Sequence, residues 1–281
     1  HCAGDTDHAQ KSETALEELA SPWLTEVMKP GKSVRWETMR GCPFRCSFCQ
    51  HRESSDRFKL SVQQLDYERI TKEARLFARA GVERVSILDP IFHLDTQRTV
   101  DLLTVFKEVG LTAQLALQCR FESVKDEFID ALEGLNVVLE FGLQTTIWEE
   151  GIAIERPNRL DIAERVIEKL KARNIPFEVS LIYGLPKQTL ASFRQSLSWC
   201  WNQQVPTIRA WPLMILRGTA LDKQREKFGL IESENEAIPH VIASNSFTHA
   251  DYRKMEALAQ TTNQPDTATQ KEINDVVFYR S

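Results

Sequence analysis

The stretch Met39–Cys49, which reads MRGCPFRCSFC, decides the fold of this chain. Its cysteines are separated by three residues and then by two, so that three thiolates lie on one short loop. Cysteine thiolates at such close spacing are ligands of iron–sulfur clusters. Three of them can hold three irons of a cubane and leave the fourth iron free for a small molecule, as an open metal position does.

A structural zinc site is the alternative for the same cysteines, with His51 or a distant residue as the fourth ligand. Zinc modules usually show two separated pairs of ligands, whereas the remaining cysteines, Cys2, Cys119 and Cys200, stand alone. A disulfide framework is not expected in a chain of 281 residues with six cysteines.

Length and charge bound the class of protein. A chain of 281 residues can bury a substantial core of its own. Its formal charge of −5 argues against a broad surface for nucleic acid, which would need a basic face. No apolar run has the length of a membrane span, and no signal peptide is visible. We expect a cytoplasmic protein, because a reducing compartment preserves exposed thiolates.

The domain organisation is expected to have three parts. Residues 1–30 are polar and predict an N-terminal arm or linker. Residues 31–230 carry the main domain, and residues 231–281 form a short C-terminal extension that would serve as a substrate lid. Because the sequence opens at His1 rather than Met, an upstream domain is left open.

From residue 31 onward, short apolar runs alternate with segments of helical period, which indicates repeated βα units and a parallel sheet. Strands are predicted at 34–38, 85–88, 112–117, 137–141, 177–182 and 208–214. Helices are predicted at 61–80, 96–109, 124–132, 161–173 and 189–199, the first with a capping box from Ser61 and Gln64. Six strands cannot close an eight-stranded barrel, so the prediction is an α/β fold, a partial (β/α)6 TIM-like barrel with its mouth at the carboxyl ends of the strands.

Three further segments resemble motifs of one enzyme superfamily. Glu140–Thr145 (EFGLQT), Ile182–Pro186 (IYGLP) and Leu213–Leu221, together with the cysteine run, resemble the radical S-adenosylmethionine (SAM) superfamily. The resemblance is strongest to the branch that holds cobalamin-binding radical SAM proteins, methylthiotransferases and oxygen-independent coproporphyrinogen dehydrogenases.

The resemblance implies a [4Fe–4S] cluster on Cys42, Cys46 and Cys49, with SAM bound at the fourth iron. It also implies a set of residues around SAM: Phe48, Gly184 and Leu185 at the adenine, Arg156 at the carboxylate, and Glu140 or Gln144 at the ribose or amino-acid portion.

Four site residues have open alternatives. Arg156 could instead be a surface ion-pair residue, and Glu140 could form a salt bridge inside the barrel. His93 could carry a proton to or from the substrate, although a lone histidine is more often structural. Cys119 could supply a hydrogen atom at the mouth, although a lone cysteine is more often a small buried hydrophobe.

Two positions depart from the superfamily's pattern. Asp89 stands where many members carry a Gly-Gly-Glu segment that holds the SAM amino group, and it replaces that carboxylate only approximately. Ser180 stands where relatives often have an acidic residue, so that it offers the ribose a hydrogen bond without charge.

The function implied by the resemblance is reductive cleavage of SAM to a 5′-deoxyadenosyl radical that attacks an unactivated C–H bond of a small-molecule substrate. A one-electron donor such as flavodoxin or ferredoxin would reduce the cluster. One hypothesis adds cobalamin-dependent methyl transfer, although the chain lacks an Asp-x-His-x-x-Gly corrinoid signature. A second is cobalamin-independent dehydrogenation, epimerisation or rearrangement, and a third is a noncatalytic metal-binding scaffold.

Overall fold

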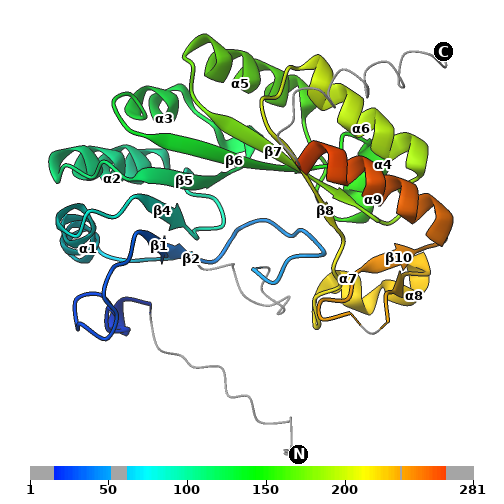
Figure 1. Ribbon diagram of the computed structural model, residues 1–281, viewed down its shortest axis with the longest axis horizontal. Helices are drawn as coiled ribbons and strands as arrows, with labels where there is room; N and C mark the ends of the chain where they lie inside the picture. The colour runs from blue at the N-terminus through cyan, green and yellow to red at the C-terminus, as the bar shows by residue number, and fades with distance from the viewer. Residues whose placement is uncertain (1–15, 52–61, 235, 264–281) are drawn as a thin grey trace, which may run out of the picture.

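The computed structural model describes residues 16–51, 62–234 and 236–263. Figure 1 shows one twisted sheet whose six strands run in the order β1-β4-β5-β6-β7-β8, every neighbouring pair being parallel. The strands are β1 (Ser33–Trp36), β4 (Arg84–Ile87), β5 (Gln114–Cys119), β6 (Val137–Gln144), β7 (Phe177–Tyr183) and β8 (Ile208–Pro212). Because β1 and β8 do not pair, the barrel stays open, and the predicted partial (β/α)6 architecture is confirmed.

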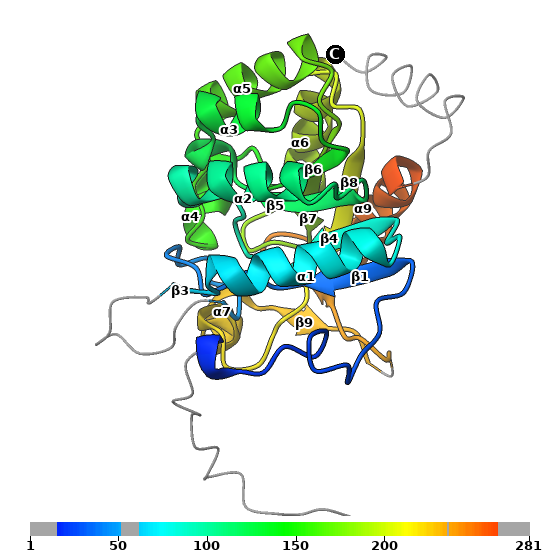
Figure 2. The same ribbon diagram turned by 90° about the vertical axis from the view of Figure 1, so that its left-hand side faces the viewer.

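Helices follow the strands and cover one face of the sheet, as the turned view in Figure 2 shows for α1, α2, α3 and α5. The connecting helices of 13 residues are α1 (Tyr67–Arg79), α2 (Thr96–Glu108), α5 (Leu160–Ala172) and α6 (Leu190–Asn202). The short helices are η2 (Leu16–Glu18), η3 (Phe121–Ser123), α3 (Asp126–Ala131), α4 (Trp148–Ala153), α7 (Ala220–Lys223) and α8 (Arg225–Phe228). Outside the main sheet lie β2 (Met39–Arg40), β3 (Gln63–Gln64), β9 (Ile231–Glu232), β10 (Val241–Ala243) and α9 (His249–Asn263).

The first long helix begins later than its sequence predicts. Asp66 is its N-cap, and the Asp66 carboxylate accepts a hydrogen bond from the Arg69 backbone N–H at 2.7 Å. Gln64 instead lies in β3, which pairs with β2. The predicted capping box is therefore wrong at Gln64, and its partner Ser61 lies outside the described residues.

Alternation along the strands separates an apolar face from a polar one. Leu139, Phe141 and Val179 are fully buried on the helix-covered face, which holds the hydrophobic core. Glu140 and Glu178, at alternate positions of β6 and β7, lie on the opposite, concave face and are partly exposed. The helices thus cover one face only, and the concave face is left for polar groups.

The two ends of the described chain pack on the same core. Trp23, in the segment before β1, meets the edge of Phe77 with ring centroids 5.4 Å apart. At the other end, α9 lies against β7 and β8, and its Tyr252 and Met255 are buried. In these ranges no helix has the length and apolar character that a membrane span requires.

Replacing Phe77 by Ala is expected to lower the free energy of unfolding by about 3–5 kcal/mol, because a large buried ring leaves a cavity. Phe77 is fully buried and meets Trp36 edge-on at 5.2 Å as well as Trp23. Denaturant unfolding measures the loss. Arg75→Ala on the exposed side of the same helix is the control and should change stability by less than about 0.5 kcal/mol.

Candidate active site

The cysteine loop, residues 41–49, lies below the concave face (Figure 1). It follows β2, which comes after the carboxyl end of β1. Cys46 is buried, whereas Cys42 and Cys49 are partly exposed. The Ser47 N–H donates to the Ile154 carbonyl at 2.8 Å, and the Leu221 N–H donates to the Ser47 carbonyl at 2.8 Å. Backbone bonds to two distant segments therefore fix the middle of the loop.

Asp89 fixes the start of the loop. Its carboxylate accepts the backbone N–H groups of Thr38 and Met39 at 2.7 and 2.9 Å, and it also accepts the Thr38 hydroxyl. Arg98 donates to the Thr38 carbonyl at 3.1 Å from the other side. Burial raises the pKa of Asp89 to about 6, although these hydrogen bonds oppose the shift. The contacts of Asp89 are those of a loop-positioning residue, and they differ from the SAM amino-group contact expected from the sequence.

Arg156 joins the cysteine loop to β6. Its Nη1 lies 3.4 Å from the Cys46 Sγ as a hydrogen-bond donor, and its Nη2 donates to the Gly142 carbonyl. The side chain is buried, so it is not the surface ion-pair residue that the sequence left open. Burial raises the pKa of the Cys42 thiol, and the nearby Cys46 and Cys49 thiols act in the same direction.

Two of the four buried side-chain polar atoms that lack a hydrogen-bond partner in the described part of the chain lie at the cysteine loop. The Ser47 Oγ and the Arg156 Nε are buried and have no hydrogen-bond partner among the described residues. Such atoms are costly unless a bound group satisfies them. They lie on the cysteine loop and on its arginine neighbour, so the arrangement fits a bound group at the loop. Cys42, Cys46 and Cys49 would hold a cluster there.

The number of cysteines on the loop bears on the zinc alternative. A structural zinc ion takes four ligands at one point, whereas the loop supplies three cysteines. Three thiolates can hold three irons of a cubane and leave its fourth iron open for a small molecule.

Gly142 makes room for two of the predicted SAM-binding residues. A Cβ at this position would lie 2.6 Å from the Gln144 Nε2 and 3.4 Å from the Arg156 Nη2. Gln144 itself has a left-handed backbone, with a φ of 71°, where the register between β6 and β7 shifts. Strained conformations of this kind cluster at functional sites. Gly142 thus brings Gln144 and Arg156 together beside Cys46.

The turn at Gly184 and Leu185 is held by one buried amide. The Gln188 Oε1 accepts both of their backbone N–H groups, at 2.7 and 3.2 Å. Gly184 has a φ of +89°, and a Cβ there would lie 3.2 Å from the Val241 carbonyl oxygen of β10. Glycine is required because the backbone is left-handed and β10 lies against it. The predicted adenine-binding turn therefore has one fixed shape at the end of β7.

A buried polar network, which no sequence motif predicts, links the ends of β6 and β7. The Glu150 Oε2 accepts the Thr145 hydroxyl at 2.6 Å and the Gln188 Nε2 at 3.3 Å. Asn158 donates to the Leu143 and Thr145 carbonyls at 2.7 and 2.8 Å. Burial raises the pKa of Glu150. Glu150, Asn158 and Gln188 are single polar residues without a recognisable spacing. The sequence alone therefore does not predict that they form a network.

Glu140 belongs to a belt of charges on the concave face. It accepts a hydrogen bond from Gln118 and lies 3.6 Å from the Arg84 guanidinium, while Glu178 pairs with Arg209 at 3.5 Å. Burial, and then repulsion from Glu178, raises the pKa of Glu140. These contacts are those of the barrel salt bridge that the sequence offered as the alternative. Ser180, two residues after Glu178 on β7, lies on the same face and is partly exposed.

Three other predicted residues pack in the interior. His93 is 1% exposed, stacks on Phe128 at 4.8 Å, and accepts the Arg120 backbone N–H at 3.1 Å through its Nε2. Cys119 is buried in the core at the end of β5, and burial raises the pKa of its thiol. Phe48 is partly buried against the core. The placement of His93 and Cys119 is that of structural residues, as the sequence alternatives allowed.

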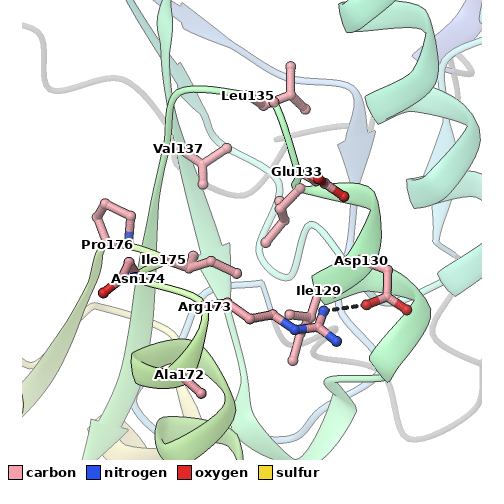
Figure 3. Close-up of a pocket in the computed structure, with 12 residues that line it drawn as sticks. Ile129, Asp130, Glu133, Leu135, Val137, Ala172, Arg173, Asn174, Ile175 and Pro176 are labelled. Carbon is pink, nitrogen blue, oxygen red and sulfur yellow. Dashed lines mark hydrogen bonds and ion pairs between the residues drawn. The ribbon is translucent and has the colours of Figure 1, made fainter.

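A pocket lies at the opposite end of the strands, before β6 and β7 begin. Figure 3 shows Val137 and Pro176 on its wall and the ion pair between Asp130 and Arg173 across it. The active sites of barrel enzymes lie at the carboxyl ends of the strands. The pocket is therefore separate from the candidate active site.

Replacing His93 by Gln is expected to remove part of the acid sensitivity of folding. Burial lowers the pKa of His93 to about 4, so the unfolded chain binds a proton between pH 6.5 and 4 that the folded chain excludes. The stability that the neutral ring contributes is present above pH 6.5 and is lost as the pH falls through this window, by about 3 kcal/mol in all.

Denaturant unfolding at a series of pH values measures this difference. His249→Gln at an exposed position is the matched control and should keep the wild-type slope. A His93→Gln variant whose stability still falls with the wild-type slope from pH 6.5 to 4 would contradict the assignment.

Comparison with known proteins places these features in a family. The family model of the radical SAM superfamily matches residues 36–200. The cobalamin-dependent radical SAM methyltransferase TokK of Streptomyces tokunonensis is 30% identical over an alignment of length 209 that covers 69% of this chain and 30% of TokK. The 2-(S-pantetheinyl)-carbapenam-3-carboxylate methyltransferase of Streptantibioticus cattleyicolor is 25% identical over an alignment of length 199 that covers 64% of this chain and 29% of that enzyme.

Solved structures show the same fold. The radical SAM methyltransferase TsrM of Kitasatospora setae, with a tryptophan substrate and a SAM analogue bound, matches with a TM-score of 0.62 at 17% identity. The match covers 73% of this chain and 42% of TsrM. The chain spans only about 30% of the length of the curated methyltransferases that it matches.

The family match covers more than half of the chain. It contains the cysteine loop and the segments Glu140–Thr145 and Ile182–Pro186 at the ends of β6 and β7. The family predicted from the sequence is thereby confirmed: this chain belongs to the radical SAM superfamily, whose members use a [4Fe–4S] cluster and SAM.

Proposed function

We propose that this chain carries the SAM-cleaving site of an enzyme that methylates an unactivated carbon of a small molecule with the help of cobalamin. The observation that carries the proposal is the grouping of Cys46, Arg156 and Gln144 below the carboxyl ends of the strands. The methyltransferase names of two curated relatives support methyl transfer as the outcome.

The residues of the site have separate tasks. Cys42, Cys46 and Cys49 hold the cluster, which together with SAM supplies a radical that can attack an unactivated C–H bond. The Arg156 guanidinium offers charge-assisted hydrogen bonds to the SAM carboxylate, with its Nε still unpartnered in this structure. Gln144 offers its amide beside it. The turn at Gly184 and Leu185, which the Gln188 amide holds in one shape, would lie along the adenine.

The concave face is the natural place for a small-molecule substrate. Beyond the charged belt, Trp211 of β8 exposes 52% of its surface and lies in register with Ile182 of β7. A substrate bound there would cover this apolar surface. A one-electron donor such as flavodoxin or ferredoxin is expected to reduce the cluster, and the acidic charge of −5 disfavours nucleic acid as the substrate.

Cobalamin enters the proposal through the relative TokK, which is named a cobalamin-dependent methyltransferase. The given residues hold no Asp-x-His-x-x-Gly signature, so they assign no corrinoid ligand. The second candidate is cobalamin-independent radical chemistry on a small metabolite, which uses the same cysteine loop and SAM-binding residues. The methyltransferase relatives and the intact cysteine loop favour either enzyme over a noncatalytic scaffold.

Product analysis of the reconstituted protein separates these functions. The full chain is loaded anaerobically with iron and sulfide, reduced with SAM present, and assayed for 5′-deoxyadenosine and S-adenosylhomocysteine with and without cobalamin. We expect both products, the second only with cobalamin. Deoxyadenosine alone under both conditions would support the second candidate, and neither product from a fully loaded cluster would contradict both enzymes.

Changing any one of Cys42, Cys46 and Cys49 to Ala should abolish cluster binding and SAM cleavage, because each thiolate holds one iron. Iron and sulfide content and the cluster's absorbance measure the loss. Cys200→Ala is the control, since this cysteine is fully buried in the core. If any of these three variants kept a full cluster and wild-type SAM cleavage, the assignment of that cysteine as a cluster ligand would be contradicted.

Gly142→Ala should weaken SAM binding about tenfold while changing stability by less than about 1 kcal/mol. The new methyl group would collide with the mobile end of Gln144, which can move away and leave the site. SAM affinity and thermal unfolding measure the two effects. Gly31→Ala, whose nearest atom is 4.0 Å away, is the matched control, and equal SAM affinity in both variants would argue against a role for Gln144.

A further inference from the structure

Arg120 places a buried positive charge against the cysteine loop. The residue follows β5 directly and is 6% exposed. Its guanidinium carbon lies 3.9 Å from the centroid of the Phe44 ring. Phe44 stands between Cys42 and Cys46, so the guanidinium packs on the loop between two of the cluster ligands. A positive charge over the face of an aromatic ring is a favourable contact, which arginine makes more often than lysine.

The charge of Arg120 is only partly neutralised. Its Nε donates to the Glu122 carboxylate at 3.0 Å, and the other oxygen of that carboxylate accepts the Arg159 backbone N–H at 3.1 Å. Burial, and then the neighbouring Arg156, lowers the pKa of Arg120, whereas Glu122 and the Cys46 thiol act in the opposite direction. The contact with Phe44 is the geometric observation that places the guanidinium beside the segment between Cys42 and Cys46.

A buried cation beside an anionic cluster has a defined effect. Reduction adds one negative charge to the cluster, and a nearby positive charge stabilises the reduced form. The interaction is strong where the surroundings exclude water, because the local dielectric constant is low. Groups that surround a metal site in this way tune its potential without ligating the metal.

We propose that Arg120 is a positioning residue of the cluster site, which holds the Phe44 side of the cysteine loop and raises the reduction potential of the bound cluster. The proposal rests on cluster binding by the three cysteines and not on methyl transfer, cobalamin or the identity of the substrate. The reduction potential of the bound cluster therefore tests this proposal, and the product analysis tests the proposed function separately.

The alternative is a purely packing role for Arg120. In that case only stability and loop order would depend on the residue, and variants that still load a cluster would keep its potential. The neighbouring carboxylate makes the two roles separable. Removing the charge of Glu122 leaves Arg120 in place but less neutralised, so that an electrostatic role predicts a shift in the opposite direction.

A redox titration of the reconstituted, SAM-free protein, followed by electron paramagnetic resonance, tests the proposal. At the wild-type midpoint, Arg120→Gln should lower the ratio of reduced to oxidised cluster about tenfold, which is about 59 mV for one electron. Arg120→Lys keeps the charge and should stay within about threefold of the wild type. Glu122→Gln should raise the ratio, and Arg194→Gln at an exposed position of α6 should leave it unchanged.

An Arg120→Gln protein with a full cluster and the wild-type ratio would overturn the proposal. If that variant fails to load iron, the double variant Arg120→Gln with Glu122→Gln, which leaves no unpaired carboxylate, decides the matter. The Arg120 guanidinium packs on Phe44 of the cysteine loop, so the double variant should have a lower ratio than Glu122→Gln alone, and equal ratios in these two variants would overturn the proposal.

Discussion

The anchoring of the cysteine loop below the strand ends is the constraint on which the site depends. A flexible loop could carry the same three cysteines, but it would not keep them in one arrangement. Here the Asp89 carboxylate holds the start of the loop, and backbone bonds from Ile154 and Leu221 hold Ser47. Arg156 then reaches Cys46 from the segment that follows α4. These anchors come from the segments after β4, β6 and β8, so folding of the strands on both sides of the sheet prepares the loop for its cluster.

The one-sided covering of the sheet explains where chemistry can take place. Helices bury the apolar side chains of each strand, and the alternate residues are left on a concave face that carries ion pairs such as Glu178 with Arg209. Polar residues at the carboxyl ends of β6 and β7 continue this face toward the cysteine loop. The strained backbone at Gln144 and the left-handed turn at Gly184 lie at the same edge. Stability and function thus use opposite faces of one sheet.

Much of the fold follows from sequence periodicity, and the cluster ligands follow from spacing. The strands alternate in burial as predicted, and Cys42, Cys46 and Cys49 need no tertiary information to be identified. Contacts between residues far apart in the chain cannot be predicted from sequence periodicity. The β2–β3 pairing shortens the first helix, and Glu150 with Gln188 links two strand ends through bonds between distant residues. The sequence marks Asp89 as a departure from the superfamily's pattern, yet its role in holding Thr38 depends on a contact between residues 51 positions apart. Arg120 carries no local signal, because its partner Phe44 lies on another element.

The most direct test of the account is whether SAM binds to the cluster itself. Electron paramagnetic resonance of the reduced, reconstituted protein, recorded with and without SAM, reports on the iron that lacks a cysteine ligand. Three-cysteine ligation with one open iron predicts a clear change in the g-values of the [4Fe–4S] signal when SAM is added. Identical spectra at saturating SAM, or a protein that retains zinc and assembles no cluster, would contradict the account.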